Sequence, residues 1–348
     1  MLFASEGKER QTMILFDLNK PLHIIPVGRV AIDFNPTDYN RPLNESINFN
    51  KYLGGSPANI AVGMARLGSR VGFLGRVSDD QFGTFVTDYF KNESIDVSHI
   101  FRCTNGEKLG LTFTEMLSPT QSSILMYREG AADLQLCVDD VDEAYIASGA
   151  CLLLTGTGLC ASPTREASLK ALTYALRNDV PVVFDADYRP YTWKSKDEIS
   201  LYTSLVAEKA DIILGSREEF DLMEGLLGLD GTDEASAEYW LNRRASVCII
   251  KHGKSGSHAC SREGSYDVKP FPVSALKGFG GGDGYASAFL YALMEGRSLP
   301  DALEMGSASA AMLVASHACS KDMPTKDRLL AFIREGKEKY GSVVTLLS

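Results

Sequence analysis

The stretch KGFGGGDGYASAFLYALMEG, residues 277–296, decides how this chain folds and where its chemistry lies. Gly280, Gly281 and Gly282 lead into Asp283, and a long apolar helical segment follows. Consecutive glycines at a helix start leave backbone N–H groups free to face an anion, aided by the helix dipole. A simple helix cap does not need three glycines, each costing up to about 1 kcal/mol within a helix. We therefore interpret the glycines as an anion nest and Asp283 as a base beside it; the alternative is that Asp283 only caps the helix.

Short apolar runs alternate with helical segments along the rest of the chain. The runs are almost continuously hydrophobic, which is typical of strands covered on both faces. Alternation of this kind predicts an α/β fold with a doubly wound, mostly parallel sheet flanked by helices. The expected strands are 23–28, 71–77, 151–156, 180–187, 211–216 and 247–253, and the expected helices are 56–68, 80–93, 163–178, 196–210, 217–227, 283–295 and 299–316.

Two segments, 31–53 and 103–130, interrupt this alternation with a period of two residues. Such a period indicates strands with one face toward solvent or a ligand. We expect a small β-sheet lid formed by about residues 34–53 and 103–130. The whole then reads as a single domain over 21–340, preceded by a polar N-terminal extension over 1–20.

Composition excludes several classes of protein. The 348 residues include 35 Lys and Arg against 45 Asp and Glu, a net charge of -10, whereas nucleic-acid binders usually carry a basic excess. The seven cysteines show no CxxC spacing, so we expect neither disulfides nor structural zinc, and a reducing cytoplasm. Apolar runs are far too short to span a bilayer, so no membrane partner is expected.

Polar residues near predicted strand ends and helix starts form further candidate sites. In LGGSPANIA (53–61), Gly55 and Asn59 suit close approach of a small polar ligand, and Ser56 is the expected helix cap. The same glycines also fit a plain tight turn. In VVFDADYRPYTW (182–193), Arg189 offers a fork for a substrate carboxylate or one half of a structural ion pair. Arg128, at the inner edge of the lid, is a second candidate for the carboxylate.

The segment TGTGLCA (155–161) supports a different class of function. It fits G-x-G-x-x-A after a strand, so a NAD-dependent oxidoreductase using Gly156 and Gly158 is an alternative. Ser162-Pro163 fits the helix start better, however, which would place both glycines before the helix. The segment HGKSGS (252–257) is no P-loop, because Cys248 stands where that motif needs glycine.

Two longer signatures resemble the ribokinase-like, or PfkB, family of carbohydrate kinases. GGSPANIAVGMARLG (54–68) with GRVSDDQFG (75–83) is similar to the first, and FGGGDGYASAFLYAL (279–293) to the second, usually D-T-x-G-A-G-D. The likeness covers about residues 22–335. Within the family, GRVAIDFNP (28–36) and FDADYRPYTW (184–193) resemble kinases of acid sugars.

The resemblance implies a role for each matching residue. Asp283 matches the catalytic base, and Gly280, Gly281 and Gly282 match the anion hole for the transferred phosphoryl group. Glu219 matches the acidic end of an N-x-x-E motif that orders magnesium through water. The remaining matches are nucleotide contacts at Ser216, Gly253 and Gly256, sugar contacts at Asp33, Gly55 and Asn59, and carboxylate contacts at Arg189 and Arg128.

Three departures from the family pattern bear on this chemistry. Ser216 replaces the Asn of N-x-x-E, and Gly281 replaces the Ala of G-A-G-D. Lys277 replaces the Asp that helps relatives hold a monovalent cation. Because a buried ammonium needs partners, we expect carbonyl oxygens around Lys277 and no requirement for potassium.

The resemblance thus implies an ATP-dependent, magnesium-requiring kinase, paired through its lids into a homodimer. The implied reaction phosphorylates the terminal hydroxyl of 5-dehydro-2-deoxy-D-gluconate, a step of myo-inositol catabolism. An alternative is 2-dehydro-3-deoxygluconate, or another acid-sugar or fructose-type substrate. A sensor of the same fold that binds its ligand without turnover is a third hypothesis.

Overall fold

The computed structural model describes residues 14–118 and 121–347. A central eight-stranded sheet has the order β1-β8-β9-β10-β11-β12-β13-β14. The first five strands pair in parallel and the last three antiparallel, which confirms the expected mostly parallel sheet. The strands are β1 Ile25–Pro26, β8 Leu152–Thr155, β9 Val182–Asp185, β10 Ile212–Ser216, β11 Val247–Lys251, β12 Ser257–Ser261, β13 Gly264–Val268 and β14 Val344–Leu347.

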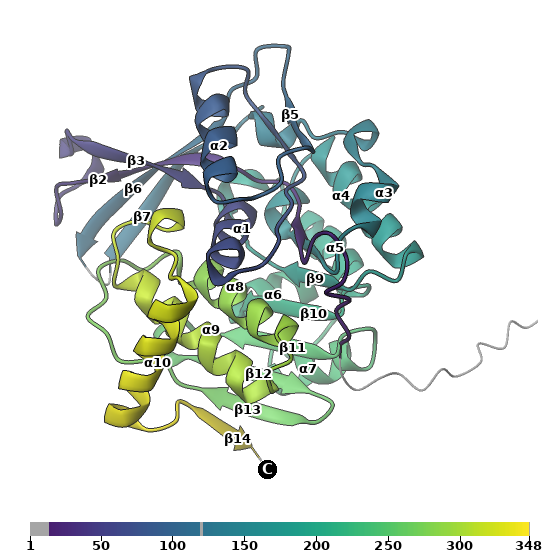
Figure 1. Cartoon of the computed structure of the whole chain (residues 1–348), viewed down its shortest axis with the longest axis vertical. Coiled ribbons are helices and arrows are strands. Elements are labelled where there is room, and N and C mark those ends of the chain that lie inside the picture. Colours follow the sequence, from purple (N-terminus) through teal and green to yellow (C-terminus); the bar gives the residue numbers. More distant parts are fainter. Residues whose placement is uncertain (1–13, 119–120, 348) are drawn as a thin grey trace, which may run out of the picture.

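Helices cover both faces of this sheet, so successive strand residues enter different cores (Figure 1). Leu153 packs into the core with α1, α8, α9 and α10, whereas Leu152 and Leu154 pack into the core with α4 to α7. Burial on both sides explains the continuous apolar runs. The helices are α1 Ser56–Leu67, α2 Gln81–Asn92, α3 Glu143–Ala147, α4 Thr164–Arg177, α5 Lys196–Ala207, α6 Arg217–Glu224, α7 Asp233–Leu241, α8 Gly281–Met294, α9 Leu299–Val314 and α10 Lys326–Tyr340.

The chain changes direction across the sheet at β1. One side of β1 pairs with β8, and the other side meets residues 71–74 through the bridges Ile24–Val71 and Val27–Leu74. Residues 75–77 continue as β4 (Gly75–Val77), which pairs in parallel with β5 (Ile100–Arg102). Open α/β sheets bind ligands beyond the carboxyl ends of the strands at such a reversal. The loops after β1 and β8 therefore border the expected ligand region.

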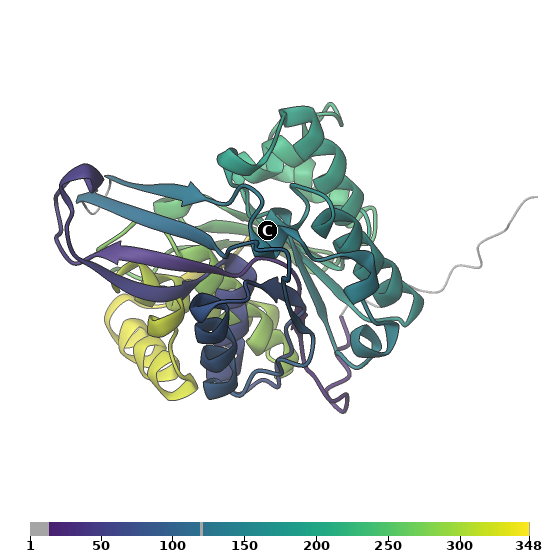
Figure 2. The same ribbon diagram turned by 90° about the horizontal axis from the view of Figure 1, so that it is seen from above.

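A second sheet has the order β3-β2-β6-β7 and extends from one side of the body (Figure 2). Its strands are β2 Ala31–Pro36, β3 Phe49–Gly54, β6 Gly110–Ser118 and β7 Gln121–Tyr127. The segments expected to form a lid supply these strands, with β2 beginning a few residues earlier than expected. Much of the expected polar extension, residues 1–13, lies outside the described residues.

At the helix starts, the expected Ser56 cap is wrong, and the alternative that Asp283 only caps its helix is excluded. Gly55, with a φ of 99°, is the N-cap of α1, and Ser56 is already helical and makes no cap. Asp283 lies inside the first turn of α8 and does not cap it; Gly280 occupies the N-cap position. The side chains of Ser56 and Asp283 contact each other instead, as described below. Gly68 ends α1 in the left-handed conformation, as the sequence predicts.

The C-terminal part contains elements that sequence patterning did not indicate. Helix α10 buries only Leu329, Ile333 and Gly336, which is too few apolar positions for a clear helical period. The hairpin β12–β13 mixes polar and small residues. Tertiary contacts stabilise both elements: β12 pairs with β11, and Leu329 and Ile333 pack into the core beside the sheet.

Candidate active site

The start of α8 brings backbone amides and a carboxylate to one place. Gly280 is left-handed, with a φ of 83°, and a Cβ there would lie 2.5 Å from Cys319 Sγ. A Cβ on Gly281 would lie 3.0 Å from Val314 Cγ1. Close packing and the left-handed backbone thus require glycine at 280, whereas a methyl group at 281 would need only a small shift of Val314. The first N–H groups of a helix have no intrahelical partner, so this turn is suited to an anion.

Asp283 is held by two side chains of α1. Ser56 Oγ donates to Oδ1 at 2.7 Å, and Asn59 Nδ2 donates to Oδ2 at 2.7 Å. Burial, and then the negative charge of Asp187, raise the pKa of Asp283, while the two hydrogen bonds lower it. A carboxylate with a raised pKa accepts a proton more readily, which is what a general base requires.

The end of β9 adds two more buried carboxylates. Asp187 forms an ion pair with Arg189 at 2.8 Å, so the ion-pair interpretation of Arg189 is present in the structure. Burial raises the pKa of Asp185 to about 7, although Lys251 opposes the rise from 3.6 Å away. A Cβ on Gly282 would lie 3.5 Å from Lys251 Nζ. Lys251 therefore places a buried positive charge beside the anion nest.

Ser216 and Glu219 close the start of α6 through a capping box. Glu219 Oε2 accepts from the Ser216 amide at 2.6 Å, and Ser216 Oγ accepts from the Glu219 amide at 3.3 Å. Glu219 Oε1 accepts from the Tyr188 amide at 2.8 Å. The charge of Glu219 also raises the pKa of nearby Asp185, and neighbouring carboxylates of this kind favour a cation between them. The role of Glu219 toward magnesium stays a prediction, since residues 14–118 and 121–347 contain no cluster of three side chains placed to ligate a metal directly.

The glycines expected to line the nucleotide flank the turn between β11 and β12. Gly253 has a φ of 57° and open space where a side chain would project. Gly256 has a φ of 102°, and a Cβ there would overlap the Val268 carbonyl oxygen. Both positions require glycine for structural reasons, and their contact with a nucleotide stays a prediction.

Asp33 lies on the lid strand β2, against Gly54, where a Cβ would overlap its carboxylate. Burial raises the pKa of Asp33, and the positive charge of Arg29 is the largest opposing cause. A Cβ on Gly55 would lie 2.7 Å from the Arg29 carbonyl oxygen. Two of the residues expected to bind the sugar, Asp33 and Gly55, therefore lie near Arg29, which the sequence analysis did not select.

Arg128 is fully engaged by protein groups. Its Nε and Nη2 lie 2.9 and 2.6 Å from Asp133 Oδ2, and Nη2 also donates to the Thr157 carbonyl at 2.8 Å. Nη1 faces Cys160 Sγ at 3.4 Å. Its expected contact with a substrate carboxylate stays a prediction, and the structure gives it a clear internal role.

Lys277 is only 1 % exposed, and its ammonium turns toward the anion nest. Nζ donates to the Ala318 carbonyl at 2.7 Å and to Cys319 Sγ at 3.5 Å. Nζ also lies 3.7 Å from the position of a Cβ on Gly280. The expected carbonyl oxygens around this ammonium are present in part: one carbonyl and one thiol accept from it.

The predicted site did not include five residues of this region: Arg29, Ser56, Asp185, Asp187 and Lys251. Arg29, Asp187 and Lys251 stand at or just beyond the carboxyl ends of β1, β9 and β11. The rule that open sheets bind ligands at those ends could have selected all three. No sequence signal paired Ser56 with Asp283, because they lie 227 residues apart.

The glycines of the alternative dinucleotide site have a packing role. Gly156 and Gly158 form a buried turn after β8, and a Cβ on Gly156 would overlap the Ala186 carbonyl. Helix α4 begins at Thr164, after Pro163, as Ser162-Pro163 suggested. This turn is closed by neighbouring backbone, which does not favour a bound pyrophosphate.

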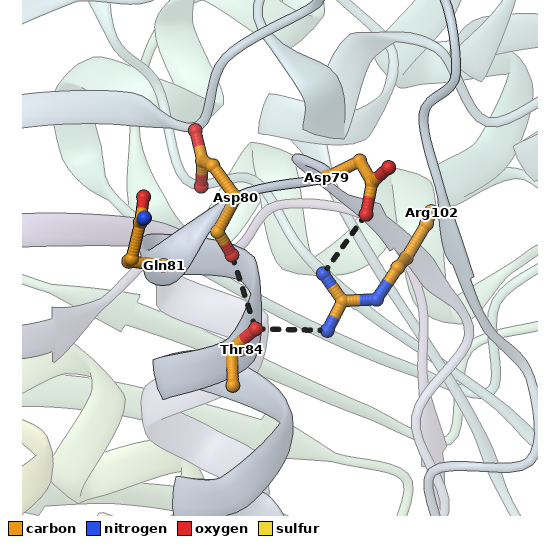
Figure 3. Close-up of a pocket in the computed structure, with 5 residues that line it drawn as sticks. All are labelled: Asp79, Asp80, Gln81, Thr84 and Arg102. Carbon is orange, nitrogen blue, oxygen red and sulfur yellow. Dashed lines mark hydrogen bonds and ion pairs between the residues drawn. The ribbon is translucent and has the colours of Figure 1, made fainter.

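A hollow of about 350 Å³ on the surface lies apart from these groups (Figure 3). Its lining residues already bind one another: Asp79 pairs with Arg102 at 3.6 Å, and Arg102 donates to Thr84 at 3.1 Å. Asp80 caps α2, whose first residue is Gln81. None of the predicted site residues line it, and these contacts explain the SDDQ segment as a structural helix start.

Comparison with known proteins agrees with the geometry. The family model described as pfkB family carbohydrate kinase matches residues 22–326. A 5-dehydro-2-deoxygluconokinase of Clostridium perfringens is 63% identical over 332 residues, covering 95% of this chain and 98% of that protein. One of Geobacillus thermodenitrificans is 50% identical over 326 residues, covering 93% and 97%.

Solved structures show the same architecture. A PfkB protein of Polaromonas sp. JS666 has a TM-score of 0.78 and 28% identity, with 89% of this chain and 99% of that one covered. A fructokinase of Xylella fastidiosa with bound ATP has a TM-score of 0.79 over 90% and 98% of the chains; at 24% identity it bears on the fold alone.

This chain belongs to the pfkB family of carbohydrate kinases. It is a sugar kinase, and the oxidoreductase alternative is wrong. Within residues 14–118 and 121–347, no helix is long and apolar enough to cross a membrane. All seven cysteines lie in that part and are free thiols, as expected.

Proposed function

We propose that the substrate of this kinase is 5-dehydro-2-deoxy-D-gluconate, phosphorylated on its terminal hydroxyl. The observation that carries the proposal is identity of 50–63% to kinases of that name over more than nine-tenths of the chain. A substrate with a carboxylate also suits a site in which Arg29 and Arg189 lie close to Asp33, Asp187 and Asp283.

In the proposed reaction the terminal hydroxyl oxygen attacks the γ-phosphorus of ATP. The new P–O bond forms as the bond to the β–γ bridging oxygen breaks, and ADP leaves. Asp283 Oδ takes the hydroxyl proton, while Ser56 and Asn59 hold its carboxylate in place. The amides of Gly280, Gly281 and Gly282, with the Lys251 ammonium beside them, stabilise charge on the transferred group.

The remaining predicted residues bind and orient the two substrates. Ser216, Gly253 and Gly256 line the nucleotide, and Glu219 holds magnesium through water. When bound, magnesium neutralises charge on the β- and γ-phosphates. On the sugar side, Asp33, Gly55 and Asn59 contact hydroxyl groups, and Arg189 faces the carboxylate.

A coupled ADP-release assay tests this proposal. The panel is 5-dehydro-2-deoxy-D-gluconate, 2-dehydro-3-deoxygluconate, D-gluconate and D-fructose, each with magnesium and with EDTA. We expect the highest kcat/KM with the first compound and no turnover in EDTA. A higher kcat/KM with another member refutes the substrate, and binding without ADP release identifies a sensor.

We further propose a cytoplasmic homodimer joined through the lids. The outer lid side chains Ile47, Leu125 and Tyr127 are 78%, 44% and 60% exposed, which supports a partner over this sheet. Light scattering during size-exclusion chromatography gives the mass directly. A mass near 38 kDa at micromolar concentration contradicts the dimer.

A further inference from the structure

Arg29 is a buried guanidinium with unused hydrogen-bond donors. It is only 5% exposed, and its recorded side-chain hydrogen bond runs from Nη2 to Thr112 Oγ1 at 3.1 Å. Its Nε is enclosed without a partner among the described residues. An arginine has five N–H donors, and leaving one buried and unpaired is costly. The unpaired Nε–H of Arg29 can therefore donate to an acceptor on a bound ligand.

The neighbouring arginines differ from Arg29 in this respect. Arg128 pairs with Asp133, and Arg189 pairs with Asp187. Arg29 makes no ion pair within 14–118 and 121–347. Burial and the charge of Arg128 lower its pKa, and the charges of Asp33 and Asp133 oppose this only in part. A negatively charged ligand beside the Arg29 guanidinium would offset the effects of burial and of the positive charge of Arg128.

The position of Arg29 is also that of a ligand-binding residue. It directly follows Gly28 beyond the carboxyl end of β1, where the sheet order reverses between β1 and residues 71–74. A Cβ on Gly28 would lie 3.6 Å from Gly158 Cα, so the loops after β1 and β8 meet here. Its partner Thr112 lies on β6 of the lid sheet. Arg29 thus joins the body to the lid at the site where such folds bind substrates.

We infer that Arg29 acts with Arg189 to select a carboxylate-bearing sugar, by presenting its free Nε–H to the substrate carboxylate. The inference rests on the proposed function and deepens it, because it adds a second specificity-determining guanidinium to the one that Arg189 supplies. Guanidinium binds carboxylate through two parallel N–H donors, which an ammonium cannot reproduce. In the proposed contact, Nη2 donates one hydrogen to Thr112 Oγ1, and its second hydrogen and the Nε–H are the two donors to the carboxylate.

A purely structural account of Arg29 is the competing explanation. A buried water could bridge its Nε to Asp133 Oδ1, which also lacks a partner. In that case substitution would weaken the fold but would affect charged and neutral sugars equally. The ratio of kcat/KM for a carboxylate over its neutral analogue therefore separates the two accounts.

The experiment compares 5-dehydro-2-deoxy-D-gluconate with its carboxamide, which has the same shape without the charge. Wild type, Arg29→Gln and Arg29→Lys are assayed by ADP release. Arg165→Lys, at a buried arginine that pairs with Glu198 outside the site, is the matched control, and Arg128→Lys tests the competing candidate. We expect Arg29→Gln to lose roughly 10- to 100-fold of the preference for the carboxylate, the range for hydrogen bonds to a charged group. We expect Arg29→Lys to lose part of this preference and Arg128→Lys to keep all of it. In the Arg29 variants, KM for ATP should stay within about threefold of the wild-type value.

Each outcome decides the matter. If wild type turns over neither this nor another acid sugar, the proposed function fails and this inference fails with it. If wild type prefers the carboxylate and Arg29→Gln keeps that preference, only this inference is overturned. If Arg29→Gln does not fold, an unchanged preference in Arg29→Lys overturns it equally. A loss of preference in Arg128→Lys that matches the loss in Arg29→Lys would place the selection on Arg128 instead.

Discussion

Replacing Asp283 with Asn removes the proton acceptor and leaves the surrounding contacts almost intact. In the wild type, Oδ2 accepts from Asn59 Nδ2 and Oδ1 accepts from Ser56 Oγ, both at 2.7 Å. The amide oxygen of Asn can keep the contact with Asn59, and its NH₂ can donate to Ser56, because a hydroxyl also accepts. The substitution therefore isolates the loss of the base.

The size of the effect follows from that role. Loss of a general base costs about 10²–10⁴ in rate. At about 1.36 kcal/mol for each factor of ten, this is about 2.7–5.4 kcal/mol of transition-state stabilisation. Burial raises the pKa of Asp283, so its ionised form costs the native state free energy that the neutral Asn does not. We accordingly expect kcat to fall at least a hundredfold, with no decrease in Tm.

Steady-state ADP release measures kcat, and calorimetry measures Tm and ATP binding. Asp283→Asn should bind ATP as the wild type does, since its side chain is held on the sugar side by α1. A kcat within about tenfold of wild type would refute the role of Asp283 as the base. A large loss of Tm together with kcat would show that its contribution is structural.

Three further changes have defined outcomes. Ser56→Ala removes a hydrogen bond that lowers the pKa of Asp283, so the rise of kcat/KM with pH, which follows deprotonation of this carboxyl, should move to higher pH; a pH–rate profile measures it. Arg189→Lys loses the planar guanidinium that contacts Asp187 and, in the proposed site, faces the substrate carboxylate, so KM for the acid sugar should rise roughly tenfold while KM for ATP stays constant in initial-rate kinetics. The buried ammonium of Lys277 provides a fixed charge beside the anion nest, so kcat/KM should be the same in potassium and tetramethylammonium buffers of equal ionic strength.

Each of these has a clear contrary result. An unmoved pH profile in Ser56→Ala would show that another group controls the rate. Unchanged acid-sugar kinetics in Arg189→Lys would make that residue structural. Several-fold activation of the wild type by potassium would show that Lys277 does not replace a cation.

The sequence predicted the parts of this protein that depend on local pattern. Continuous apolar runs identify strands such as β8 and β9 because a strand buried on both faces has no polar side. The glycines before Asp283 identify the anion nest, because only glycine tolerates the left-handed turn at 280 and the close approach of Cys319. The sequence pattern did not indicate α10, about half of whose residues are exposed, or the β12–β13 hairpin, whose strands are short and rich in polar and small residues.

Tertiary structure decided which polar groups are paired and which are left free. Asp283 and Ser56 both look like helix caps in the sequence, yet the packing of α1 against α8 directs them to each other. The sequence pointed to Arg128 and not to Arg29 as an anion contact, but Asp133 pairs with Arg128, whereas among residues 14–118 and 121–347 no carboxylate pairs with Arg29. The difference depends on distances of a few ångströms between segments far apart in the chain. Because hydrogen bonds and ion pairs act only over such distances, their partners are fixed by the folded structure.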